Sequence, residues 1–374
     1  MKFKKFLNDA ASLLGRSFRK NAGYLVSLTI SVLLAVLLGG AIMAISGHDP
    51  IEGYGLMIKG AFGSQRYIGN TLAKAATLCL TGLATAIAAH AGIFNVGGEG
   101  QLFLGAMASA IVGARLTGVS PWIAVPLCLL AAMLAGGFYA WVPAVLKVKM
   151  KVNEVITTIM LNSAAIFFCS YLTNGPLKTM EKGVSAGTDK VDPAFMFGRV
   201  IRLSSLTESI YLTIIIALLV WYVMKKTSVG FEMKLTGQNP RFAHYIGIRA
   251  DKLTIGSMVV SGAICGLVGM FEIFGLHGRF IESVSNEFFF DGMLVAMIMR
   301  YNPVGIILMS VFFGAMKIGG KYMEMQANIP SSLIVIIQSI IIFFMAAEQG
   351  ILASFRQRRA RRRAAIALGK GSEA

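Results

Sequence analysis

The stretch YLVSLTISVLLAVLLGGAIMAIS, residues 24–46, runs for 23 positions without a charged side chain. As an α-helix it is about 34 Å long, enough to cross a hydrocarbon core of about 30 Å. It exceeds the roughly 15 apolar residues of a signal peptide, and no A-x-A cleavage site follows directly, so we expect a retained span. The chain of 374 residues has 56% hydrophobic and 14% charged side chains, where soluble proteins have roughly 25% charge. The sequence therefore indicates an integral membrane protein.

Working outward from this first span, the rest of the chain is a series of similar apolar segments. They fall at about 67–91, 98–117, 122–146, 153–173, 209–224, 253–275, 287–300, 302–320 and 331–349. We therefore predict an all-α, polytopic membrane bundle of about ten transmembrane helices, two of them interrupted or re-entrant. The expected divisions are a basic N-terminus (1–22), one transmembrane domain (23–350) with a loop at 225–252 on the same face as the N-terminus, and a basic tail (351–374).

The charge balance indicates topology. Lys and Arg number 35 against 18 Asp and Glu, a net charge of +17. An even number of crossings places most of the positive residues on one face of the membrane. They lie in the N-terminus, the turn at 147–151, the loop at 225–252 and the tail. By the positive-inside rule that face is cytoplasmic, as are both termini. The basic tail fits attraction to anionic headgroups better than nucleic-acid binding.

The sequence lacks the signatures of catalysis and of metal or nucleotide binding. It has no GxxxxGK[ST] phosphate loop and no HExxH. The four cysteines stand apart, each inside an apolar stretch, and the four histidines are scattered. We expect no catalytic centre, metal or cofactor, so an intramembrane enzyme or a structural assembly subunit is a weaker interpretation. The energy for active transport would then come from a separate subunit.

A glycine-rich stretch, AGIFNVGGEGQLFLGAM at 91–107, opens the third span and carries Asn95, Glu99 and Gln101. A carboxylate near hydrocarbon needs a partner facing protein or water. Glycine-broken backbone at membrane depth is tolerated where it is buried or lines a cavity. These residues predict a broken helix beside a translocation path. The alternative is a tight turn at the cytoplasmic interface, capped by Asn95 and Glu99.

Two other stretches place polar groups inside spans. NEFFFDGMLVAMIMRYNPVG, at 286–305, has Asp291 early in a short apolar run that Pro303 ends. Its position matches that of 91–117 in the first half, as in transporters built from repeats. VNEVITTIMLN, at 152–162, places Asn162 more than two turns inside a helix, where an amide needs a partner. We assign Asp291 and Asn162, with the three residues above, to the path or its gates.

The loop TGQNPRFAHYIGI, at 236–248, predicts a short helix defined at both ends. Asn239 is an N-cap, Pro240 suits the first helical position, and Gly247 is a natural stop. A helix this short is marginal alone and gains stability by docking its apolar face in a groove. That face is formed by Phe242, Tyr245 and Ile246. We expect contact with an ATPase subunit; the alternative is packing on the chain's own surface.

The following helix contains SGAICGLVGM at 261–270, where Gly262 and Gly266 form a GxxxG face for close helix packing. Glu272 comes one turn after Gly269. Its carboxylate must face the bundle interior or the outer mouth.

With these motifs the chain resembles the membrane subunits of ABC importers in the branched-chain amino acid and ribose permease family. It is most similar to the nucleoside branch, often labelled simple-sugar permeases. The resemblance rests on the joint occurrence of the stretches at 91–101, 152–162, 237–248, 261–270 and 290–320. It covers most of the chain, from about residue 80 to 348.

The resemblance implies a multi-pass subunit of the bacterial inner membrane that imports a nucleoside. It implies three partners: a second, similar permease, a cytoplasmic ATPase with two nucleotide-binding modules, and an extracytoplasmic substrate-binding lipoprotein. Residues 239–247 would be the coupling helix. The alternatives are a sugar or amino-acid permease of the same kind, or an ion-coupled secondary transporter in which Glu99 or Asp291 binds the proton.

Overall fold

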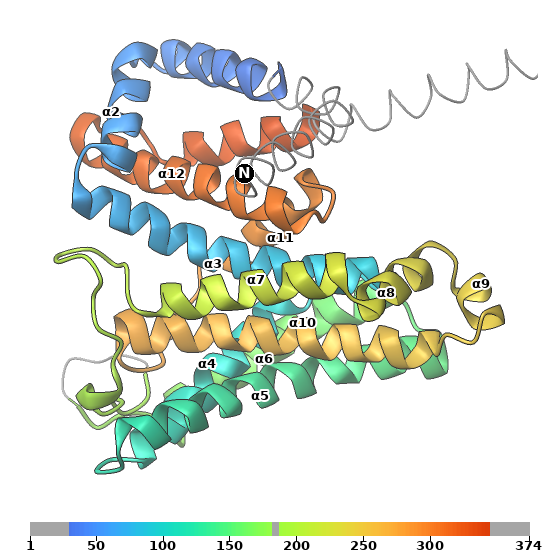
Figure 1. Ribbon diagram of the computed structural model, residues 1–374. Helices are drawn as coiled ribbons and strands as arrows, with labels where there is room; N and C mark the ends of the chain where they lie inside the picture. The colour runs from blue at the N-terminus through green and yellow to red at the C-terminus, as the bar shows by residue number, and fades with distance from the viewer. Residues whose placement is uncertain (1–29, 182–186, 345–374) are drawn as a thin grey trace, which may run out of the picture. The chain divides into compact units, whose positions relative to one another are not determined.

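The computed structural model describes residues 30–181 and 187–344, and their regular structure is helical apart from two isolated β-bridges (Figure 1). The predicted all-α polytopic bundle is confirmed. Among these residues six helices are long and apolar enough to cross a membrane, or up to seven if a bent pair counts as one span. The six are α3 (Gln65–His90), α5 (Pro121–Met150), α6 (Glu154–Asn174), α7 (Ser209–Lys226), α10 with its π-helical end (Ala250–His277) and α12 (Pro303–Ala327).

Helix is present in each of the ten predicted segments, but four of these helices are not long and apolar enough to cross a membrane alone. The Ile30–Ile45 helix counts as a span only together with the helix that follows it. α4 (Gly98–Arg115) has 18 residues and carries charge at both ends. α11 (Phe288–Ile298) has 11 residues, about 16 Å, which is too short to cross alone. The last described helix, Ser332–Phe344, is also short. The basic ends predicted at 1–22 and 351–374 lie outside the described residues.

The chain divides into two compact units, Met1–Leu56 with Met323–Ala374, and Met57–Tyr322. In the first unit the Ile30–Ile45 helix is followed by a bend of 120° into α2 (Pro50–Phe62), which the sequence interpretation did not foresee. Gly47 adopts a left-handed φ of +82° at this bend. The Asp49 carboxylate then accepts a hydrogen bond from Ile51 N (2.8 Å), and Pro50 begins the helix.

In the second unit α10 (Ala250–Glu272) packs against α3, α4 and α5 (Figure 1). A Cβ atom added at Gly262 or Gly266 would collide with backbone carbonyls of α5, at Gly136 and Ala132. A Cβ at Gly105 of α4 would meet the backbone of Gly266. The predicted close packing on the GxxxG face is therefore confirmed.

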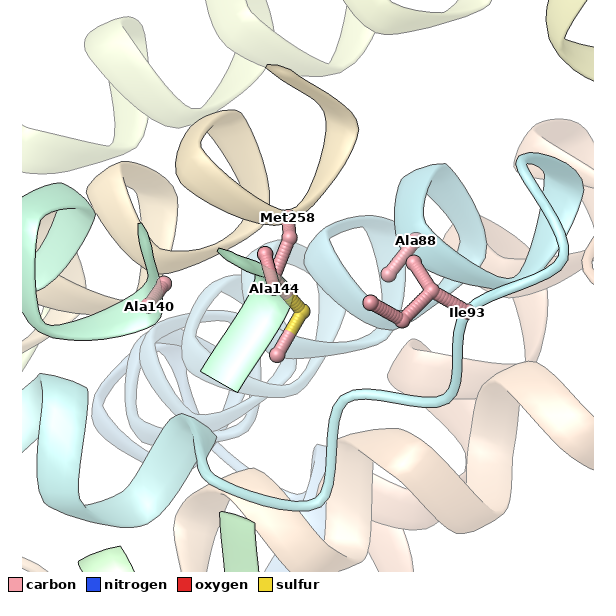
Figure 2. Packing of buried hydrophobic residues seen from close by; sticks show 5 residues of the cluster. All are labelled: Ala88, Ile93, Ala140, Ala144 and Met258. Carbon is pink, nitrogen blue, oxygen red and sulfur yellow. The ribbon is translucent and has the colours of Figure 1, made fainter. Parts of the chain in front are cut away.

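Small side chains continue this close packing toward the loop between α3 and α4. Figure 2 shows Met258 of α10 between the alanines of α5, Ala140 and Ala144, and the pair formed by Ala88 and Ile93. These five side chains are almost completely buried. Ile93 belongs to the non-helical stretch at 91–97 that separates α3 from α4. The break in the helical path at the glycine-rich motif is thus anchored in the core.

Candidate functional site

The first site residue is Glu99, in the first turn of α4, which is buried (4% exposed). Its carboxylate accepts hydrogen bonds from Ser285 Oγ and, at 3.0 Å, from Phe289 N. Phe289 lies in the first turn of α11, where backbone N–H groups have no intrahelical partner. An anion is favoured at this end of a helix. Glu99 therefore joins the N-terminal ends of the two interrupted segments, α4 and α11.

The amides of Asn95 and Gln101 pair with each other across the α4 N-terminus. Asn95 Nδ2 donates to Gln101 Oε1 (2.9 Å), and Gln101 Nε2 donates to Asn95 Oδ1 (3.1 Å). Asn95 also donates to Ser261 Oγ of α10 (2.9 Å) and accepts from Gly97 N (3.0 Å). Both amides are buried, and they fix the turn that leads into α4.

Asn162 holds the same turn from α6. Its Oδ1 accepts from Gly100 N (2.8 Å) and its Nδ2 donates to Val96 O (2.7 Å). The structure thus brings four of the five predicted path residues to one place, the buried start of α4. Their hydrogen bonds are made to the protein itself.

The fifth predicted residue, Asp291, lies one turn into α11 and forms an ion pair with Lys317 of α12. Both side chains are partly buried, with 16% of Asp291 and 22% of Lys317 exposed. The pair connects α11 to the helix that follows it.

Lys317 also lines a cavity of about 280 Å³ inside the second unit. Its wall combines the aromatic rings of Phe271 and Phe288 with several hydroxyl and amide groups. These polar groups come from α3, α7, the loop before α7 and the segment before α11: Asn70, Thr77, Ser205, Thr207, Thr213 and Asn286. The charged lining residues are Lys74, Glu272, Lys317 and Lys321. None of the five predicted path residues is part of this wall.

Two charged residues of this wall, Glu272 and Lys74, have defined contacts. Glu272, at the end of α10, is 8% exposed, and its Oε1 accepts from Thr77 Oγ1 of α3 at 3.0 Å. Of the two positions expected for its carboxylate, the bundle interior and the outer mouth, the burial of Glu272 fits the interior. The Lys74 ammonium lies 3.2 Å from the centroid of the Phe288 ring, a cation–π contact.

The loop at 187–208 closes part of the cavity. Ser205, Leu206 and Thr207 belong to the wall, and Ser205 N donates to Asn70 Oδ1 (2.7 Å). Near its start the loop is held through Lys190. The Glu181 carboxylate accepts hydrogen bonds from Lys190 and from Arg279. These two cations hold the pKa of Glu181 below its usual value.

A second feature lies at the other end of α7 and α10, where α8 (Ser228–Gln238) and α9 (Pro240–Tyr245) form the predicted coupling region (Figure 1). The cap is as predicted: Asn239 Oδ1 accepts from Phe242 N (3.0 Å), Pro240 begins the helix, and Gly247 has a φ of +86°. The α8 helix was not predicted.

The apolar face of α9 is exposed. Phe242 and Ile246 are half exposed and Tyr245 is 88% exposed, whereas Ala243 is fully buried against the chain. The helix therefore rests on Ala243, while Tyr245 makes little contact with the described part of the chain and Phe242 and Ile246 are half covered by it. Of the two expectations, contact with a partner and packing on the chain's own surface, the exposure of Tyr245 fits the first.

Sequence reasoning missed Lys74 and Lys317. Both lie within predicted apolar segments, and an ionisable side chain inside a span is by itself a sign of function. The sequence carries this signal at both lysines, as it does at the carboxylates of Glu99, Asp291 and Glu272. Among the described residues no group of three or more His, Cys, Asp and Glu side chains could hold a metal ion.

The chain combines long apolar helices around a charged cavity with a short capped helix exposed at one end. These features are typical of a multi-pass membrane transport subunit. Residues 67–346 match the family described as branched-chain amino acid transport system / permease component, and the chain belongs to this family. The sequence similarity to known relatives covers most of the chain. The guanosine ABC transporter permease protein NupP of Bacillus subtilis is 32% identical, over 89% of this chain and 96% of its own length.

Two other relatives are similar to the same degree. The nucleoside ABC transporter permease protein NupB of Lactococcus lactis is 34% identical, over 85% of this chain and 89% of its own. The glucose ABC transporter permease protein TsgB13 of Haloferax volcanii is 33% identical, over 84% of this chain and 85% of its own.

Proposed function

We propose that the chain is the membrane subunit of an ATP-driven importer that carries a nucleoside through the cavity beside Lys74 and Glu272. It acts with a second permease, a cytoplasmic ATPase with two nucleotide-binding modules and a substrate-binding lipoprotein. The bacterial inner membrane holds the complex. The positive-inside rule supports cytoplasmic termini and a cytoplasmic α9.

The observation that carries the ATP-driven part is the exposed face of α9. Phe242, Tyr245 and Ile246 extend from a short helix capped at both ends, and apolar surface of this kind marks an interaction site. A helix laid in a groove of a partner is a common mode of recognition. Residues 239–247 would then transmit movement of the ATPase to α8 and α10, on which α9 rests.

The cargo is inferred from two sources. The relatives NupP and NupB are named for guanosine and nucleosides. The cavity, about 280 Å³, is close to the lower end of the range for small-molecule sites, about 300–1,000 Å³, and has aromatic, hydroxyl and amide groups on its wall. A base can stack on apolar faces while the ribose hydroxyls bond to polar side chains.

The predicted path residues have a supporting role in this proposal. Asn95, Glu99, Gln101 and Asn162 hold the start of α4 against α11, and Asp291 ties α11 to α12. Since Phe288 and Lys317 come from these helices, movement at the joint would change the shape of the cavity. We therefore assign the five residues to a gate.

A sugar is the second candidate cargo, favoured by the similarity to the glucose permease TsgB13. The test is reconstitution of the four components in proteoliposomes. We expect labelled guanosine to accumulate with ATP but not with a non-hydrolysable analogue, and excess glucose not to compete. Competition by glucose would move the assignment to a sugar. Accumulation by the permease alone under a proton gradient would establish an ion-coupled transporter and overturn the proposal.

A further inference from the structure

The Glu272 carboxylate is held in place with one oxygen unused. Its Oε1 accepts from Thr77, and no described residue donates to its Oε2. Glu272 is the last residue of α10 before the π-helical turn Ile273–His277, and its neighbour Phe271 shares the cavity wall. Single π-helical turns inside α-helices are frequent at functional sites. A buried carboxylate inside a span normally has a partner or a functional role.

The Lys74 ammonium forms no ion pair with a carboxylate of the described residues. The ion pairs of the described residues do not include it, and its contact is with the face of Phe288. The backbone that carries this ring is held on both sides, because Phe288 N donates to Ser285 Oγ (3.2 Å) and Phe288 O accepts from Thr81 Oγ1 (3.3 Å). The ammonium carries three N–H donors, and the ring face does not use all of them.

From this arrangement we infer that Glu272 and Lys74 bind the two halves of a nucleobase edge, and that the preferred cargo is a guanine nucleoside. The inference rests on the proposed function. Guanine presents two adjacent N–H donors, at N1 and the 2-amino group, beside the O6 carbonyl. Each carboxylate oxygen can accept two hydrogen bonds, so Oε2 and the second lone pair of Oε1 can accept both N–H groups, and an ammonium donates to the carbonyl oxygen.

Other bases satisfy this pair less completely. Inosine keeps N1–H and O6 but lacks the 2-amino group. Adenosine has no O6, so it can offer one donor and one ring nitrogen. A site built to hydrogen-bond a group discriminates strongly against the analogue that lacks it. Glu272 therefore determines the preference for guanosine over inosine, and Lys74 the preference for either over adenosine.

The test compares initial ATP-dependent uptake of guanosine, inosine and adenosine by the complete transporter in proteoliposomes. Every variant shares the same binding protein, so a change in preference arises in the permease. For the wild type we expect guanosine over inosine by about tenfold. Glu272→Gln should reduce this preference to about twofold, because the amide nitrogen faces one N–H donor. Lys74→Met should lower guanosine and inosine uptake together by about tenfold and leave their ratio unchanged.

Two further variants serve as checks. Lys59→Met removes the same charge at an exposed position outside the cavity and should leave all three preferences unchanged. Glu272→Asp keeps the charge but withdraws it by one methylene, and should give an intermediate preference even if Glu272→Gln fails to assemble. Equal preferences in the wild type and in both Glu272 variants would overturn the inference. Absence of ATP-dependent uptake of any nucleoside by the wild type would instead overturn the proposed function.

Discussion

The Glu99 carboxylate of α4 accepts a hydrogen bond from the backbone N–H of Phe289, 190 residues away, in the first turn of α11. The side chain of Phe289 covers the start of α4 in return, since a Cβ atom at Gly98 would collide with its ring. Two helices that begin inside the bundle thus satisfy each other's ends.

Glu99→Ala should lower the free energy of unfolding by about 2 kcal/mol, because Phe289 N and Ser285 Oγ lose a charged acceptor in a buried place. Thermal unfolding of the purified protein in detergent would measure the loss. Glu287→Ala is the matched control, an exposed acidic residue at the same end of α11. Equal stability of Glu99→Ala and Glu287→Ala would contradict the role of Glu99 as a cap.

Gly266→Ala should be destabilising by about 1–3 kcal/mol, because the added methyl group meets the backbone of Ala132 and the helices α5 and α10 must separate. Gly256→Ala, in the same helix, has nothing within 4 Å and should be neutral or stabilising by up to about 1 kcal/mol. The melting temperatures of the two variants provide the comparison. The packing argument fails if both shift in the same direction by the same amount.

The Asp291–Lys317 pair should show coupling in a double-mutant cycle. Asp291→Asn leaves a partly buried ammonium without its counter-ion and is expected to lose about 2 kcal/mol, less than the roughly 3–5 kcal/mol of a fully buried pair. Adding Lys317→Met should recover at least about 1 kcal/mol relative to the sum of the single changes. Additive losses would show that the two residues contribute independently.

Tyr245→Asp should leave the permease in the membrane at its normal level and release the ATPase during co-purification. The side chain is 88% exposed, so the fold does not need it, but an introduced carboxylate would oppose docking of an apolar face. Tyr245→Phe keeps the apolar ring and should retain the ATPase. Normal uptake and retained ATPase in Tyr245→Asp would remove α9 from the coupling interface.

Much of the fold could be predicted because the responsible patterns are local. The apolar runs gave a helix in each of the ten segments, and Asn239, Pro240 and Gly247 defined α9 at both ends. The bend before α2 escaped prediction, since Gly47 and Asp49 formed a signal too short to separate from an ordinary loop. The polar residues of 91–107 were correctly expected to be buried with partners, but they hold a turn and a helix end and do not line the cavity.

The sequence alone determined that this is a polytopic helical membrane protein with a short capped helix between spans. Hydrophobicity over about 20 residues and capping within four residues act along the chain, so neighbours suffice. Only the tertiary structure decided which charged groups reach the cavity. Glu99, Glu272 and Lys74 are similar in sequence, each an ionisable residue in an apolar setting. Glu99 meets Phe289 and becomes a cap, while Glu272 meets Thr77 of α3 and Lys74 meets the Phe288 ring of α11 at the cavity wall. Partners in a bundle are set by packing between segments far apart in the chain.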